Sequence, residues 1–129
     1  MNTEHLAAFG RALAQGDFAT AFSHASEQVE LFSPIFEAPF VGTEAAIQAM
    51  TVVKSVVSST ERQGVIQGDD RVIQFGTTTI DDVTGNSMEV IELDAEGLIT
   101  RITVFWRPLR LALVGHAKLA TLLKRDPVI

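Results

Sequence analysis

The spacing of apolar residues changes once along this chain, and this change restricts the possible folds more than any other feature. Up to residue 58 apolar residues recur mostly at helical intervals, whereas afterwards they alternate with polar residues, as in half-buried strands. Clusters of Gly, Asp and Asn interrupt the alternating part and are typical of tight turns. We therefore predict four strands in this part, near residues 61–67, 71–80, 86–94 and 98–107.

The N-terminal part predicts two consecutive helices. Residues 3–14 carry an apolar stripe with helical spacing, and Gly16 follows as a common C-terminal cap. Asp17 is a favourable N-cap for a second helix, because its carboxylate can accept a hydrogen bond from a free backbone N–H group. The apolar stripe of this second helix extends from Phe18 as far as Ala25.

A short strand and two further helices complete the pattern. Val29 to Phe32 reads as a strand that stops at Pro34, since proline cannot donate to a strand ladder. Thr43 starts a third helix, and residues 109–123 predict a C-terminal helix. That last helix packs either on its own domain, which we favour, or on a partner subunit.

The order of these elements predicts an α+β domain in which helices cover one face of a curved antiparallel sheet. The chain has 129 residues, of which 47 % are hydrophobic, so residues 1–129 can bury one core of their own. The absence of cysteine excludes disulfides, thiol catalysis and cysteine zinc sites.

Charge and hydropathy narrow the range of partners. The net charge is −6 and no basic face is evident, so we expect no nucleic acid partner. The chain has no apolar run of the roughly 20 residues that a membrane-spanning helix needs, and no signal-like apolar segment. We expect a cytoplasmic protein without a membrane partner.

The hairpin of the last two strands allows residues to be assigned to its two faces. We place Glu92 opposite Thr100. One face then holds Met88, Val90, Ile102, Val104 and Trp106, and the other holds Glu89, Ile91, Leu93, Ile99, Arg101, Thr103, Phe105 and Arg107. Both faces carry more apolar area than a solvated sheet usually does, so we predict a homodimer formed through the sheet.

Several short motifs resemble the nuclear-transport-factor-2-like superfamily, in particular its SnoaL-like and ketosteroid isomerase-like members. They are Gly16-Asp17 between the first helices, Ser33-Pro34 after the first strand, Gly42, and Phe105-Trp106 in the last strand. The resemblance implies a cone-shaped, curved antiparallel sheet wrapped by the N-terminal helices, which is a cystatin-like α+β barrel. It also implies an apolar pocket inside the cone.

The isomerase reaction uses a catalytic base, a tyrosine and an acid, and the same resemblance assigns each of them to a position in this chain. Two of these three positions hold a different type of residue here. The catalytic base falls on Ser33, whose hydroxyl is too weak a base without a neighbouring base. The tyrosine falls on Phe9, and the chain has no tyrosine at all. The acid falls on Glu89 and the tryptophan on Trp106, so one carboxyl group and the apolar framework remain.

Glu89 is therefore the candidate catalytic residue. In the predicted register it lies beside Thr103 and near Arg101, where burial would raise its pKa and the arginine would lower it. The alternative is a polar pair at the rim of the sheet. The candidate ligand-binding residues, each of which alone is more often a core residue, are Phe9, Phe22, Ser33, Phe36, Phe40, Phe105 and Trp106.

The three histidines are weaker candidates. His24 is expected near the pocket mouth, where it could act as an acid or base or simply cap a helix. His5, His24 and His116 show no metal-ligand spacing, so we expect no metal site and no cofactor.

These observations leave three functions open. The first is a domain that binds a small hydrophobic molecule in an apolar pocket. The second is an enzyme of isomerase, cyclase or hydrolase type that acts on a hydrophobic cyclic or polyketide-like substrate with Glu89 as acid or base. The third is a dimerisation scaffold whose pocket is filled by side chains.

Overall fold

The computed structural model describes residues 1–129 and contains four helices and six strands. The helices are α1 (Glu4–Ala14), α2 (Phe18–Phe22), α3 (Thr43–Val56) and α4 (Leu109–Leu122). The strands are β1 (Ala25–Phe32), β2 (Phe40–Val41), β3 (Ser59–Gln67), β4 (Arg71–Ile80), β5 (Val83–Leu93) and β6 (Ile99–Arg107). The predicted α+β class is confirmed, and the predicted elements occur in the predicted order, but the short strand β2 was not predicted.

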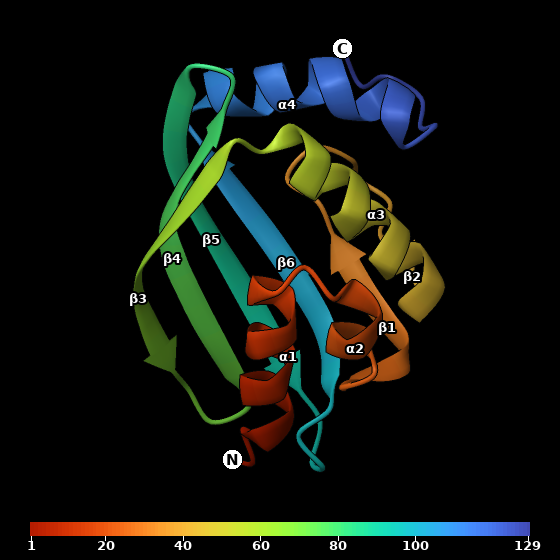
Figure 1. Cartoon of the computed structure of the whole chain (residues 1–129), viewed down its shortest axis with the longest axis vertical. Coiled ribbons are helices and arrows are strands. Elements are labelled where there is room, and N and C mark those ends of the chain that lie inside the picture. Colours follow the sequence, from red (N-terminus) through yellow and green to blue (C-terminus); the bar gives the residue numbers. More distant parts are fainter.

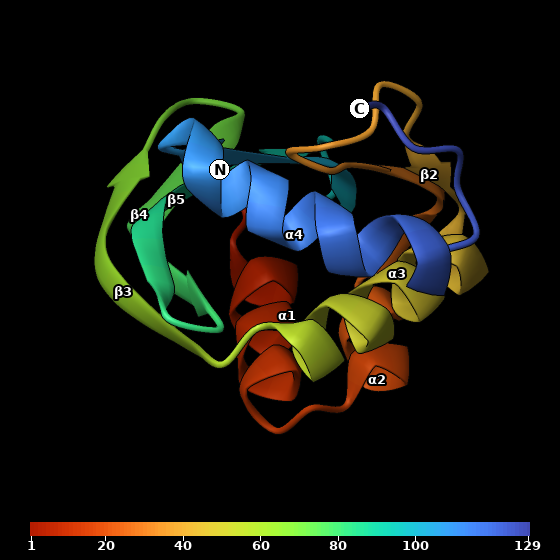
Figure 2. The same ribbon diagram turned by 90° about the horizontal axis from the view of Figure 1, so that it is seen from above.

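All six strands form one curved sheet in the order β2-β1-β6-β5-β4-β3. Neighbouring strands are antiparallel except for β1 and β6, which are parallel. The sheet is therefore mostly, not wholly, antiparallel, and it does not close into a barrel because β2 and β3 are free edges. Helices α1, α2 and α3 lie on the open side of the curve, and α4 crosses one end of it (Figures 1 and 2).

The predicted register of the last hairpin is wrong by one residue on β6. Glu92 pairs with Arg101, while Leu93 pairs with Ile99, so Thr100 is the extra residue of a β-bulge. The Thr100 hydroxyl donates a hydrogen bond to the Glu92 carbonyl at 3.2 Å. Because side chains alternate between faces, this one-residue slip moves the β6 side chains from Arg101 onwards to the opposite face relative to β5, while Ile99 keeps its predicted partner Leu93.

The corrected register separates a concave inner face from a convex outer face. Glu89 pairs with Val104 on the inner face, and Met88 pairs with Phe105 on the outer face. Arg101, which the predicted register places near Glu89, lies on the outer face and forms a salt bridge with Glu30 at 2.9 Å. Thr103 pairs with Val90, also on the outer face.

The second helix is shorter and the first strand longer than predicted. Asp17 caps α2 as expected, since its carboxylate accepts hydrogen bonds from the Thr20 N–H at 3.1 Å and the Thr20 hydroxyl at 2.6 Å. The helix ends at Phe22, and Ala25 already pairs with Ile99 of β6. Pairing with a strand that is remote in sequence thus overrides the local helical pattern at Ala25.

The core has two parts. The larger cluster fills the space between the inner face and helices α1 to α3, and Phe9, Phe22 and Val29 are among its buried members. The smaller cluster of Ile80, Val83 and Leu111 joins the sheet to α4. Helix α4 therefore packs on its own chain. None of the four helices has the length and apolar character that crossing a membrane requires.

Candidate functional site

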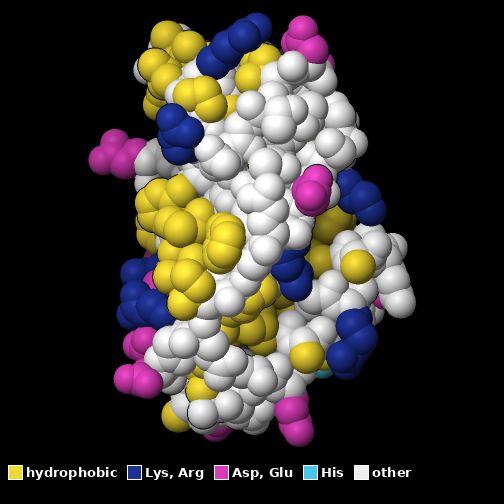
Figure 3. Space-filling view, turned by 90° about the vertical axis from the view of Figure 1, so that its left-hand side faces the viewer, with side chains coloured by type: hydrophobic (Ala, Val, Ile, Leu, Met, Phe, Trp, Pro, Cys, Tyr) yellow, Lys and Arg dark blue, Asp and Glu magenta, His cyan; other side chains and the backbone are white.

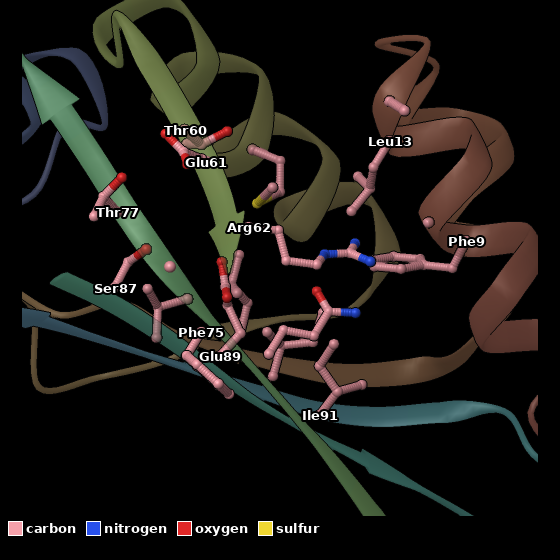
Figure 4. A pocket seen from close by; sticks show the side chains of 18 residues that line it. Phe9, Leu13, Thr60, Glu61, Arg62, Phe75, Thr77, Ser87, Glu89 and Ile91 are labelled. Atoms are coloured by element: carbon pink, nitrogen blue, oxygen red, sulfur yellow. The ribbon is translucent and has the colours of Figure 1, made fainter. Parts of the chain in front are cut away.

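A cavity of about 340 Å³ lies between α1, α3 and the inner face of strands β3 to β6. Its walls combine apolar side chains from the core with a polar group around Glu89 (Figure 4). The apolar lining residues include Phe9, Leu13, Leu31, Met50, Ile91, Ile102 and Val104, and the polar ones include Arg62, Gln74, Thr77, Ser87 and Glu89.

Two glycines shape the walls of this cavity in different ways. A Cβ atom at Gly10 of α1 would have no neighbouring heavy atom within 4 Å, so the helix faces empty volume there. At Gly76 of β4 a Cβ atom would collide with the Glu61 carbonyl group of β3, so a glycine lets these strands approach closely. Gly76 pairs with Ser87 on the inner face, and neither residue fills the cavity next to Glu89.

Glu89 brings a carboxyl group into this cavity from β5. It is half-buried, and its carboxylate makes no hydrogen bond with another side chain and no ion pair. Burial raises the pKa of Glu89, because a low-dielectric surrounding disfavours the charged form, and the positive charge of Arg62 partly counteracts this effect. The group is thus suited to hold or exchange a proton at a higher pH than an ordinary glutamate.

Arg62 approaches the same cavity from β3. It pairs with Gly76, and a bulge follows at Gln63 before the ladder resumes at Gly64. Figure 4 shows its side chain extending across the cavity in the direction of Phe9. The sequence analysis did not identify Arg62. A signal was present, because a glycine inside a strand often marks a bulge or a close backbone approach, and Gly64 and Gly76 lie in two neighbouring predicted strands.

The structure brings two of the candidate residues together at the cavity, namely Glu89 and Phe9. Phe22 lies behind Phe9, and their rings meet edge to face with centroids 5.3 Å apart. Phe36 and Phe40 are buried in the larger core cluster and do not line the cavity.

Ser33 serves a different role from the one its position suggested. Its hydroxyl oxygen accepts hydrogen bonds from the backbone N–H groups of Ile35 at 3.2 Å and Phe36 at 2.8 Å. These bonds order the turn after β1, and Ser33 is not among the residues that line the cavity.

The pair Phe105-Trp106 lies outside the cavity for two different reasons. Phe105 is on the outer face and is 49 % exposed, as the corrected register requires. Trp106 is on the inner side but nearer to α4, where it packs against the cluster of Ile80, Val83 and Leu111. The indole lies so close to Gly115 of α4 that a Cβ atom there would stand 2.7 Å from it.

The histidines also lie away from the cavity. The Nδ1 atoms of His5 and His24 are 3.0 Å apart, which joins the start of α1 to the end of α2. The Nε2 atom of His116 accepts a hydrogen bond from the Val128 N–H at 3.0 Å. No three His, Asp or Glu side chains are arranged to hold a metal ion.

No protein-family model and no curated protein matches the chain. Solved structures do match it. A steroid delta-isomerase from Pseudomonas aeruginosa has 16 % sequence identity and a TM-score of 0.85, covering 93 % of this chain and 89 % of its own. A bacterial protein with a cystatin-like fold from Silicibacter pomeroyi has 16 % identity and a TM-score of 0.81, with 94 % and 83 % covered.

A third match is TerC, co-crystallised with polyporic acid, at 18 % identity and a TM-score of 0.67, with 86 % of this chain and 95 % of its own covered. Other matching structures are named NTF2-like proteins. The chain therefore has the NTF2-like, cystatin-like fold, and the fold expected from Gly16-Asp17, Ser33-Pro34 and Phe105-Trp106 is confirmed.

Proposed function

We propose that this NTF2-like fold binds a small, mostly apolar molecule in the cavity between α1, α3 and the inner face of the sheet. The observation that carries the proposal is the Glu89 carboxyl group, which lies half-buried and without a side-chain partner in a cavity with both apolar and polar walls. The volume of about 340 Å³ is within the usual range for small-molecule sites.

Two matched structures support a small organic ligand. One is named a steroid delta-isomerase, and the other was crystallised with polyporic acid. Both share the fold with this chain, which holds a cavity with apolar walls and a few convergent polar groups. That combination gives affinity through burial and orientation through hydrogen bonds.

A neutral fluorescent probe tests the binding function directly. We expect wild-type protein to bind N-phenyl-naphthylamine with one site per chain. Gly10→Leu should abolish binding without unfolding the protein, because the leucine side chain would occupy the empty volume beside Gly10. Equal binding by wild type and Gly10→Leu would contradict the proposal, as would the absence of binding by wild type.

The second candidate is an enzyme that uses Glu89 as acid or base on a hydrophobic cyclic or polyketide-like substrate. The raised pKa of Glu89 favours it, since a general acid or base works best when its pKa is near the working pH. The chain lacks the partners of the isomerase reaction, because Phe9 has no hydroxyl and Ser33 is engaged in a turn.

Proton exchange distinguishes the enzyme from the binding domain. In deuterated water, an enzyme of this kind would exchange the protons next to the carbonyl group of tetralone faster than buffer does. Glu89→Gln should then lose this exchange while it still binds N-phenyl-naphthylamine. Exchange at the buffer rate with wild-type protein would reject proton transfer from carbon and leave the binding function.

The outer face of the sheet supports a homodimer as the assembly of this domain. Phe75, Met88 and Phe105 are exposed and face one another across three neighbouring strands. Figure 3 shows hydrophobic side chains gathered along one side of the molecule. Beside this patch, Arg71, Glu92, Arg101 and Glu30 form a row of alternating charge that a second copy in the opposite direction would complement.

A further inference from the structure

A second cavity of about 490 Å³ adjoins the first, between α1 and strands β3 and β4. The two cavities share Gly10, Ala14, Arg62 and Gln74 as lining residues. Arg62 therefore stands where they meet, with its side chain available to both. A ligand longer than the first cavity would extend past Arg62 into the second.

The second cavity is positively charged although the protein carries a net charge of −6. Its only charged lining residues are Arg11 and Arg62, and no carboxylate reaches it. Both arginines are exposed to solvent, so a dissolved anion can reach them.

The guanidinium groups of Arg11 and Arg62 form no ion pair and no hydrogen bond within the protein. The ion pairs of this structure involve Arg71, Arg101 and Lys118. The arginine side chains that donate hydrogen bonds are Arg71, Arg101, Arg107 and Arg125. Arg11 and Arg62 thus keep all their donors free, and a guanidinium group binds a carboxylate through two parallel hydrogen bonds.

We infer that the ligand is an amphipathic organic acid, with an apolar body in the first cavity and an anionic group bound by Arg62 in the second. The inference rests on the proposed binding function and adds the chemical class of the ligand. Arg11 lines the same cavity and increases its attraction for the anion. Glu89 lies at the other side of Arg62, in the first cavity.

The anion and Glu89 are coupled through Arg62. The charge of Arg62 lowers the pKa of Glu89, and an anion bound to Arg62 would cancel much of that charge. The pKa of Glu89 should therefore rise further on binding, so the protein takes up a proton together with the acid. A neutral ligand of the same shape would cause no such uptake.

A matched pair of ligands tests the role of Arg62 by isothermal titration calorimetry. Phenylbutanoate and phenylbutanamide share a phenyl ring and chain and differ in charge. We expect wild-type protein to bind the acid about tenfold more tightly, because hydrogen bonds to charged groups are stronger than those to neutral ones. Arg62→Gln should remove this preference and still bind the amide.

Arg110→Gln is the control, since Arg110 is exposed on α4 and lines neither cavity. It makes the same change in net charge and should keep the preference for the acid. A preference that survives in Arg62→Gln, or an equal affinity of wild type for both compounds, would overturn the inference while leaving the proposed function intact. Binding of neither compound would reject the inference and the proposed function together.

Proton uptake gives an independent readout. Titrations of phenylbutanoate in two buffers with different enthalpies of ionisation should show uptake by wild type and none by Glu89→Gln. Phenylbutanamide should show none with either protein. Uptake that persists in Glu89→Gln would assign the proton to another group and overturn the coupling through Arg62.

Discussion

Arg62 and Glu89 face one cavity from strands β3 and β5, and the charge of Arg62 lowers the pKa that burial raises at Glu89. The two side chains form no ion pair. Space for a ligand group thus remains beside both charges. A ligand group that binds Arg62 would therefore also change the pKa of Glu89.

The first prediction follows from that electrostatic balance. Arg62→Gln removes the positive charge that favours the Glu89 carboxylate, so the pKa of Glu89 should rise further. Carbon-13 NMR of the glutamate side-chain carboxyl groups, followed as a function of pH, measures it. An unchanged or lower Glu89 pKa in Arg62→Gln would contradict the prediction.

Glu89 should also make stability depend on pH. Below the ordinary pKa of 4.5 the carboxyl group is protonated in the folded and the unfolded chain, so Glu89 and its Gln replacement are equivalent. As pH rises through the raised pKa of folded Glu89, the wild-type protein loses stability that Glu89→Gln keeps. Urea denaturation should find Glu89→Gln more stable at neutral pH, with a difference that vanishes on acidification. A constant difference at all pH values would refute this.

Gly10 should be replaceable without harm to the fold. Gly10→Ala adds a methyl group that meets no heavy atom within 4 Å, and alanine favours a helix interior over glycine. We expect the free energy of unfolding to increase by about 0.5–1 kcal/mol. Gly76→Ala is the matched contrast, because its methyl group would collide with the Glu61 carbonyl and destabilise the β3–β4 pair. The prediction fails if both variants change stability in the same direction.

Trp106 should contribute to stability and not to the cavity. Trp106→Ala removes the indole that packs between the small core cluster and Gly115 of α4. We expect a loss of about 3 kcal/mol in the free energy of unfolding, with binding of N-phenyl-naphthylamine retained at low temperature. Loss of binding with little change in stability would instead make Trp106 a ligand-binding residue, the role that the sequence suggested.

The outer face should control assembly. Phe105→Glu places a carboxylate in the exposed patch with Phe75 and Met88, and two such charges would meet at the twofold axis of a dimer. Sedimentation velocity should show a dimer for wild type and a monomer for Phe105→Glu. Val41→Glu, on the exposed edge strand β2 away from this patch, should remain a dimer. A monomeric wild type would reject the dimer.

The sequence alone determined the four helices, the first strand and the last four strands, and the order in which they follow one another, but not the short strand β2. Helical spacing, the Asp17 cap, the stop at Pro34 and the alternation after residue 58 are local properties, because each depends on a few neighbouring residues and on water. These local signals predicted the α+β class, and the motifs around Ser33-Pro34 predicted the fold. They also directed attention to Glu89, which does lie in the cavity.

The tertiary structure alone decided which residues form the site. The bulge at Thr100 sets the register of β6, and with it the places of Val104 inside and Phe105 outside. Gly10 leaves open volume beside α1, and Arg62 reaches the cavity from β3, which β4 separates from the Glu89 strand β5. Alternation along one strand fixes which residues share a face, but it leaves open how that face aligns with the next strand. That alignment depends on the energy of contacts between segments far apart in the chain.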